Sequence, residues 1–336
     1  MFAIVVVGFL IICERKNVSQ SVSECLNICG NVIIPSLFPF MVLSAFALNT
    51  GVFDNKNKLV DIVMKKVFRL PYVSFSAIVF GFIGGYPVGA RIISELYENG
   101  KISSSDAKHL MSFCVNAGPA FVVSAVGEMI LHSKKTGYIM LISCCVSSLI
   151  IGVLYARVKR VKDELYIKQN NKAVSISDSL ICAVGSSCKG IISVCGWILV
   201  FSALSGIIRT FVINEKTKLI FDSLSEITTG LTSAVKIGGI AFAAACIAFG
   251  GICIAFQLLP YIKKCEMKIT EYLRFRIINA VLTFFLTKII MSFTDVAVNV
   301  YSKAEPEIHF APASAALMIM CSILIFNMAS VSQVDF

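Results

Sequence analysis

Residues 84–91 read Gly-Gly-Tyr-Pro-Val-Gly-Ala-Arg, a helix-breaking run that ends in a cation within a strongly apolar chain. Its glycines carry no side chains and its proline has no amide donor, so a regular helix is disfavoured there. Hydrocarbon cannot hydrogen-bond freed backbone groups, so a break at membrane depth is tolerated only when buried in protein or facing a water-filled cavity. The run predicts a break inside a membrane-embedded segment. The alternative is a loop that joins two helices, with Arg91 at the interface.

The composition places the chain in a membrane. Of its 336 residues 57% are hydrophobic and the mean hydropathy is +0.83, far above soluble domains. Stretches of roughly 20 mainly apolar residues can span a bilayer. The clearest are Gly137–Ala156, Ile191–Ile213, Gly238–Tyr261, Ile277–Phe293 and Pro312–Phe326. We therefore predict an all-α polytopic membrane protein.

A second break, Ser-Glu-Ile-Thr-Thr-Gly at residues 225–230, occupies the corresponding place in the second half of the chain. Paired interruptions in matching halves point to the substrate site of a transporter. The order of elements predicts an internal repeat and five regions. These are an N-terminal membrane segment (1–18), a first repeat (19–156), a basic linker (157–176), a second repeat (177–293), and a C-terminal transmembrane helix with its tail (294–336).

The basic residues predict the topology. The net charge is +10, but five, six and five of the 30 lysines and arginines lie in the expected loops 51–71, 157–176 and 262–276. Such clusters set membrane orientation, which argues against a nucleic-acid surface. If each break is a re-entrant hairpin, the second repeat is inverted and all three loops lie on the cytoplasmic side. The prediction is about eight transmembrane helices and two re-entrant hairpins, with both termini inside.

The candidate substrate-binding residues come from both breaks and from the helices that follow them. At the first break, the planar guanidinium group of Arg91 can donate two parallel hydrogen bonds to a carboxylate. A carboxylate at membrane depth is a functional hypothesis by default, which singles out Glu226. Asn116, in Asn-Ala-Gly-Pro, and Gln257 supply donors and acceptors, although close helix packing explains these two positions equally well. The full set is Gly85, Tyr86, Gly89, Arg91, Asn116, Lys189, Glu226, Thr228, Thr229 and Gln257.

Other classes of function find little support. The 13 cysteines form no paired motif with histidines, so they predict neither a metal site nor a redox site. A formal S-x-x-K match at residues 186–189 lacks its companion motifs. We expect no enzymatic activity and no cofactor. The expected partners are the lipid bilayer and a small anionic substrate, whereas a coupling ion (H⁺ or Na⁺) and a homo-oligomer stay open.

Several motifs in order carry a family resemblance. They are Pro-Ser-Leu-Phe-Pro-Phe at 35–40, the run that ends at Arg91, Asn-Ala-Gly-Pro at 116–119, Glu-Ile-Thr-Thr-Gly at 226–230, and Gly-Gly at 250–251 before Gln257. Together they resemble the sporulation integral membrane proteins of the nucleoside-recognition, or Gate-domain, superfamily. The resemblance covers nearly the whole chain. The Gate domain is similar to concentrative nucleoside transporters, which implies inverted repeats with hairpin tips at 84–91 and 226–230.

The resemblance implies movement of dipicolinic acid from the mother cell across the outer forespore membrane. Dipicolinate is a flat ring with two carboxylates, for which Arg91, Lys189 and helix amino termini are suitable partners. A nucleoside would use neutral groups and acids, as Asn116, Gln257 and Glu226 offer. Three hypotheses stay open: a dipicolinate transporter working by alternating access, a carrier of nucleosides or other small polar metabolites, and a non-transporting scaffold of spore-envelope assembly.

Overall fold

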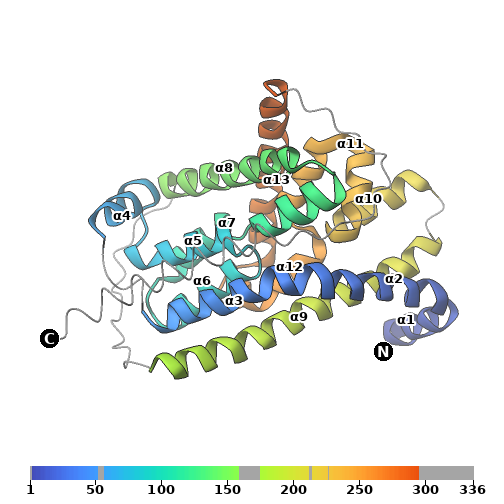
Figure 1. Cartoon of the computed structure of the whole chain (residues 1–336), viewed down its shortest axis with the longest axis horizontal. Helices are drawn as coiled ribbons and strands as arrows, with labels where there is room; N and C mark the ends of the chain where they lie inside the picture. Colours follow the sequence, from blue (N-terminus) through green and yellow to red (C-terminus); the bar gives the residue numbers. More distant parts are fainter. Residues whose placement is uncertain (1, 52–56, 159–174, 212–213, 226, 295–336) are drawn as a thin grey trace.

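The computed structural model describes residues 2–51, 57–158, 175–211, 214–225 and 227–294. Within these ranges the regular structure is entirely helical, as the sequence predicts. Two long helices, at residues 134–158 and 176–211, lie at opposite edges of the molecule, and short helices lie between them (Figure 1).

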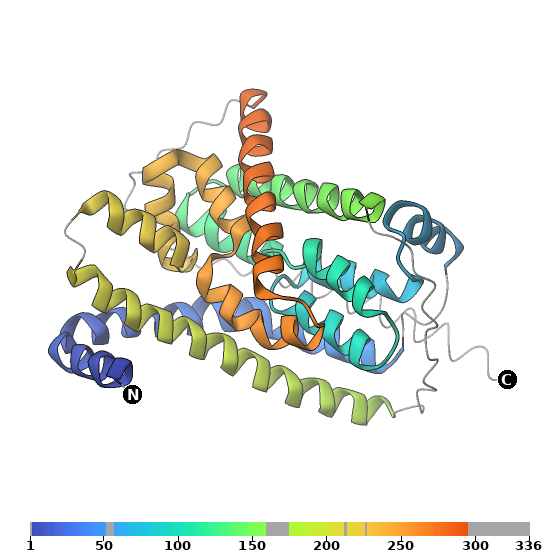
Figure 2. The same ribbon diagram turned by 180° about the vertical axis from the view of Figure 1, so that it is seen from behind.

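The long helices lie in two directions. The first long helical stretch is nearly continuous and comprises α2 (Arg15–Ile28), a π-helical turn η1 (Cys29–Ile33) and α3 (Ile34–Asn49). Its C-terminal part packs along α9 (Ile176–Phe211), while α8 (Lys134–Val158) lies at the opposite edge. A fourth, α13 (Ile269–Ser292), packs against α8 and runs across the other long helices in both views (Figure 2). The N-terminal α1 (Phe2–Cys13) contacts α2 and α9.

Five helical stretches are long and apolar enough to cross a membrane, or six if one bent pair counts as a span. They are Arg15–Asn49, Lys134–Val158, Ile176–Ile208, Gly230–Lys264 and Ile269–Ser292. Four of these overlap the stretches predicted from hydropathy, whereas the predicted helix Pro312–Phe326 lies outside the described residues. The described part of the chain therefore confirms a polytopic helical protein but does not confirm eight transmembrane helices.

The expected basic loop 51–71 is partly helical. Its second half forms α4 (Lys58–Val63) and a π-helical turn η2 (Met64–Phe68), where the sequence analysis predicted only a loop. Asn57 caps this segment by accepting a hydrogen bond from the Leu59 amide. The segment meets the following helix at 90°. The apolar face of η2 explains the difference, because Met64 and Phe68 are buried and hold the segment against the core.

Short helices surround each break. The first break separates α5 (Phe75–Ile83), preceded by a 3₁₀ turn η3 (Tyr72–Ser74), from α6 (Val88–Glu98). At 1.5 Å per residue these helices are about 14 and 17 Å long, too short to cross roughly 30 Å of hydrocarbon singly. Next come α7 (Ser104–Phe113) and the π-helix η4 (Ala120–Ile130), with residues 114–119 unwound between them.

The second half repeats this order of elements after α9. A short α10 (Glu215–Ser225) is followed by α11 (Ile227–Phe249), which departs from helical geometry at Gly239, and by α12 (Gly251–Lys264). Then comes α13, as α8 follows η4. The shared order fits the predicted repeat. Because α13 runs across α8 (Figures 1 and 2), the described residues do not confirm that the repeats are inverted.

Candidate functional site

The tip of the first hairpin packs directly against the unwound segment 114–119. The Tyr86 amide donates to the Asn116 carbonyl at 2.7 Å. Gly85 has φ of +72°, and a Cβ there would lie 2.5 Å from the Gly118 nitrogen. Only glycine meets both demands, since its backbone tolerates positive φ and nothing extends toward Gly118. The predicted break at 84–91 and the unwound segment therefore form one unit.

Two further glycines extend this close contact along the hairpin. A Cβ at Gly81 of α5 or at Gly89 of α6 would overlap the Cys114 carbonyl. The hairpin thus presents a face without side chains to the unwound segment. The structure therefore places Gly85 and Gly89, predicted as substrate-binding residues, in backbone packing.

The second half contains a comparable contact between its two breaks. Gly250 and Gly251 interrupt the chain between α11 and α12 with φ of +94° and +73°. A Cβ at Gly251 would lie 3.3 Å from the carbonyl oxygens of Leu224 and Ser225, at the end of α10. Gly230 packs against the backbone of Asp222 so closely that a Cβ would overlap its carbonyl. In each half, a hairpin tip therefore rests on the break that follows it.

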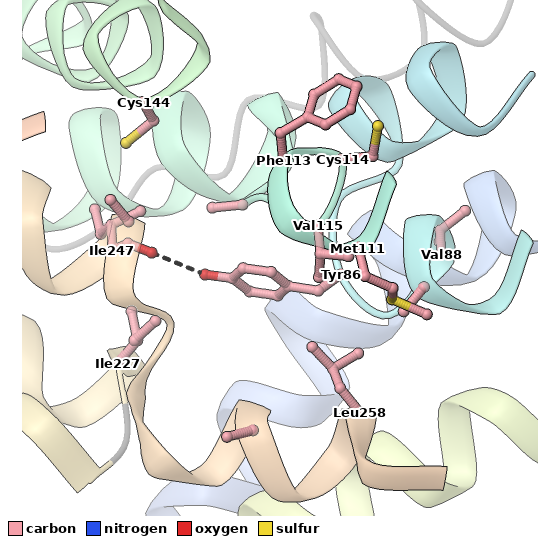
Figure 3. Packing of buried hydrophobic residues seen from close by; sticks show 14 of the residues in the cluster. Tyr86, Val88, Met111, Phe113, Cys114, Val115, Cys144, Ile227, Ile247 and Leu258 are labelled. Carbon is pink, nitrogen blue, oxygen red and sulfur yellow. Dashed lines mark hydrogen bonds between the residues drawn. The ribbon is translucent and has the colours of Figure 1, made fainter. Parts of the chain in front are cut away.

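The two halves meet at the C-terminal end of α11, whose last four carbonyls need partners from beyond the helix. The Cys246 carbonyl accepts from the Gly250 amide at 3.0 Å. The Tyr86 hydroxyl, from the first hairpin tip, donates to the Ile247 carbonyl at 3.2 Å (Figure 3). Arg276 donates to the last two carbonyls, those of Ala248 and Phe249. All four groups are thus hydrogen-bonded.

Arg276 also connects this helix end to the first half. Its guanidinium donates to the Val115 carbonyl at 2.5 Å, and the side chain is buried at 1% exposure. A buried cation held by carbonyls at a helix C-terminus is favoured by the negative end of the helix dipole. The sequence analysis counted Arg276 among the charges of a cytoplasmic loop, and this was wrong. The loop is short because α12 ends at Lys264 and α13 begins at Ile269.

Asn116 belongs to a buried polar network between the breaks, α8 and α13. Its amide donates to the Phe113 carbonyl at 2.7 Å, and its oxygen accepts from the Ser148 hydroxyl at 2.7 Å. Ser148 in turn accepts from Asn279 at 3.1 Å, and Asn279 accepts from Ser147. Protein partners therefore engage both ends of the Asn116 side chain, although its role as a ligand stays a prediction.

One pocket, which we call the central pocket, lies where the interruptions of both halves meet. It holds about 510 Å³ of empty volume, of which about 50 Å³ admits the centre of a water-sized molecule. Side chains therefore nearly fill it. Its walls come from η1, α3, both hairpin tips, the unwound segment, η4, α9 and α12. They comprise Ile33, Ser36, Leu37, Tyr86, Gly118, Phe121, Val194, Ile198, Ile227, Ile254 and Gln257. Tyr86 and Gln257 are the predicted residues that it brings together.

A second pocket, which we call the vestibule, brings together the predicted cations. Arg91 of α6 and Lys189 of α9 line it with Lys264 of α12. It holds about 570 Å³ of empty volume, of which about 250 Å³ admits the centre of a water-sized molecule, so it is roomier than the central pocket. The structure thus divides the predicted site between two pockets.

The remaining predicted residues come from the second hairpin tip. Glu226 lies outside the described residues, and so do the side chains of Thr228 and Thr229, whose backbone begins α11. Among the described residues, no three His, Cys, Asp or Glu side chains are grouped to hold a metal ion. Sequence reasoning missed the buried role of Arg276 and the residues of α3 and α9 that line the central pocket. For Arg276 a signal existed, because the apolar residues that follow it continue directly into a predicted membrane helix.

The fold and the pockets define an integral membrane protein with broken helices at its centre. Residues 32–162 match a family model named Gate and described as nucleoside recognition. The chain is 25% identical over 200 residues to the sporulation integral membrane protein YlbJ of Bacillus subtilis (strain 168), a match that covers 54% of this chain. It spans about half of that relative, 49% of its length. No solved structure matches the chain significantly.

Proposed function

We propose that this chain is a sporulation membrane transporter that moves dipicolinic acid from the mother cell across the outer forespore membrane by alternating access. One observation carries the transport assignment: interruptions from both halves of the chain meet around a single pocket. Broken helices whose ends face a shared site are typical of secondary transporters. Because the central pocket is nearly filled, the substrate enters only when the surrounding helices move apart.

The pocket has features that suit a flat aromatic dianion. Its walls are mostly aliphatic or aromatic, which favours burial of a ring. α6 begins at Val88 and α12 at Gly251, next to wall residues Tyr86 and Ile254, and α11 begins at the wall residue Ile227. The positive ends of helix dipoles favour carboxylates. Similarity to a sporulation membrane protein supports the biological setting.

A nucleoside or another small neutral metabolite is the second candidate substrate. Among the described residues, the wall of the central pocket includes no charged side chain, and Ser36, Tyr86 and Gln257 offer neutral hydrogen-bonding groups. This chemistry suits a sugar hydroxyl or a base as well as it suits a carboxylate. The family description supports the same alternative.

Uptake into proteoliposomes tests the proposal. We expect the purified chain to move labelled dipicolinate faster than labelled uridine, and Arg91→Ala and Glu226→Ala to abolish uptake while the protein still inserts. Preferential uptake of uridine would replace dipicolinate by the second candidate. A correctly inserted chain that moves neither compound would contradict transport of these substrates and favour a scaffold.

A further inference from the structure

The two pockets are neighbours along two shared helices, α9 and α12. On α9 the vestibule residue Ser193 directly precedes the central-pocket residue Val194. On α12 the vestibule residue Tyr261 lies one helical turn after Gln257 of the central pocket. The vestibule residue Arg91, in α6, follows Tyr86 of the hairpin tip, a central-pocket residue, by five positions. The polar vestibule and the apolar central pocket are therefore adjacent.

Charge balance distinguishes the vestibule from an ordinary polar surface. Arg91 pairs with Glu95 at 2.7 Å, and Lys264 pairs with Glu98 at 2.9 Å. Lys189 makes no hydrogen bond or ion pair with the described residues, although it lines the same pocket. Three cations thus face two carboxylates, which leaves one positive charge to attract an anion.

The geometry of Arg91 indicates where an anion would bind. Its Nε donates to Glu95, and one Nη donates to the Ser186 hydroxyl at 2.7 Å, while its other Nη is buried without a hydrogen-bond partner in the described part of the chain. A buried guanidinium nitrogen without a partner is unfavourable, and a carboxylate oxygen is its strongest common acceptor. Lys189, three residues after Ser186 on the same helix, adds a mobile ammonium group.

We propose that the vestibule is an entry site that binds a small carboxylate and delivers it to the central pocket. This inference rests on the proposed function and adds an ordered path to it. The carboxylate first meets the exposed Lys189, where water still screens its charge, and then reaches the buried Nη of Arg91 as the side chains around it move. The central pocket then receives it with most of its water removed. The outer end of the vestibule is close to the turn 265–268, adjacent to Lys263 and Lys264, a turn that the positive-inside rule places on the cytoplasmic side.

Equilibrium binding of labelled dipicolinate to the purified full chain tests the vestibule. Lys189→Gln removes the unpaired charge from an exposed side chain, so folding is preserved. We expect it to weaken binding about five- to tenfold, near the lower end for a charged hydrogen bond because the pocket is open to water. Lys189→Arg keeps most of the affinity, and raising the salt concentration weakens binding to the unmodified chain.

The matched control is Lys288→Gln, on an exposed face of α13 where the ammonium lies 4.9 Å from the Phe284 ring centre. It should bind dipicolinate as the unmodified chain does. Trp197, the chain's single tryptophan, provides a second readout. It lies on α9 one turn beyond Ser193 and packs on Phe201 and Phe256. The change in Trp197 fluorescence when dipicolinate is added should give the same order of affinities among the variants.

Each result decides between the vestibule and the proposed function. If Lys189→Gln binds dipicolinate as tightly as Lys288→Gln does, the vestibule proposal is overturned, even if uptake by the unmodified chain is intact. If Lys189→Gln weakens binding but the unmodified chain shows no uptake, the entry site stands and the transport function falls. If the unmodified chain binds no dipicolinate, the vestibule is overturned, and the uptake comparison with uridine alone decides the function.

Discussion

Replacing Arg276 by methionine tests the link between the two halves most sharply. Methionine has a similar length and no donors, so Arg276→Met keeps much of the packing and leaves the carbonyls of Val115, Ala248 and Phe249 without their partner. These carbonyls lack partners within their own helices because the chain breaks there, so no neighbouring amide is positioned to replace the guanidinium. The variant therefore separates backbone satisfaction from side-chain volume.

The expected loss of stability follows from the number of carbonyls. A buried polar group without a partner costs about 1–3 kcal/mol, which gives an upper bound of roughly 9 kcal/mol for the three. Phe249 is only partly buried, so water can replace one bond. Removing a buried charge also relieves its desolvation, which offsets part of the loss. We therefore expect a net destabilisation of about 3–5 kcal/mol.

Thermal unfolding in detergent, followed with a thiol-reactive dye, measures this loss. The buried thiols of Cys114 and Cys246 lie near the affected carbonyls and become reactive on unfolding. Arg274→Met is the matched control, because Arg274 is exposed on the same helix. We expect Arg276→Met to melt several degrees below Arg274→Met. Equal melting temperatures would refute the role assigned to Arg276.

Three further substitutions test the contacts around the breaks. Gly85→Ala places a methyl group against Gly118 at positive φ, so we expect the amount of folded protein in the size-exclusion peak to fall sharply. Gly185→Ala is the control, because a Cβ there meets nothing within 4 Å, and its peak should match that of the unmodified chain. Tyr86→Phe removes one buried hydrogen bond and should lower stability by about 1 kcal/mol, and an unchanged melting temperature would contradict that bond. Asn279→Leu removes one hydrogen bond from each of Ser147 and Ser148, which keep partners in Thr283 and Asn116, and should destabilise the chain by about 1–3 kcal/mol, whereas a stable variant would show that the network is dispensable.

The positions of the breaks could be predicted because glycine and proline act locally. The run 84–91 interrupts the chain between α5 and α6 in the structure, whereas Gly250-Gly251 breaks the stretch Gly238–Tyr261 that hydropathy predicted as one span. Hydropathy likewise predicted the helices α8 and α13, whose apolar stretches are long. These features depend on residues near one another in the chain, so a single sequence carries them.

The contacts between the breaks could not be predicted in the same way. Nothing local in the sequence indicates that Tyr86 reaches the end of α11, or that Arg276 holds carbonyls from both halves. The division of Arg91 and Gln257 between two pockets likewise depends on how α6, α9 and α12 pack. Charge counting placed Arg276 in a loop because positive charge alone does not distinguish an interface cation from a buried cap.

Blocking the central pocket tests the account's central claim, that interruptions from both halves enclose the path of the substrate. Ile254 lines this pocket, whereas Ile252, two residues earlier on α12, is 41% exposed. Both are replaced by tryptophan, and uptake of labelled dipicolinate and uridine is measured with proteoliposomes that contain equal amounts of folded protein. The account predicts that Ile254→Trp abolishes uptake and that Ile252→Trp retains it. Uptake by Ile254→Trp at the rate of the unmodified chain would contradict the account.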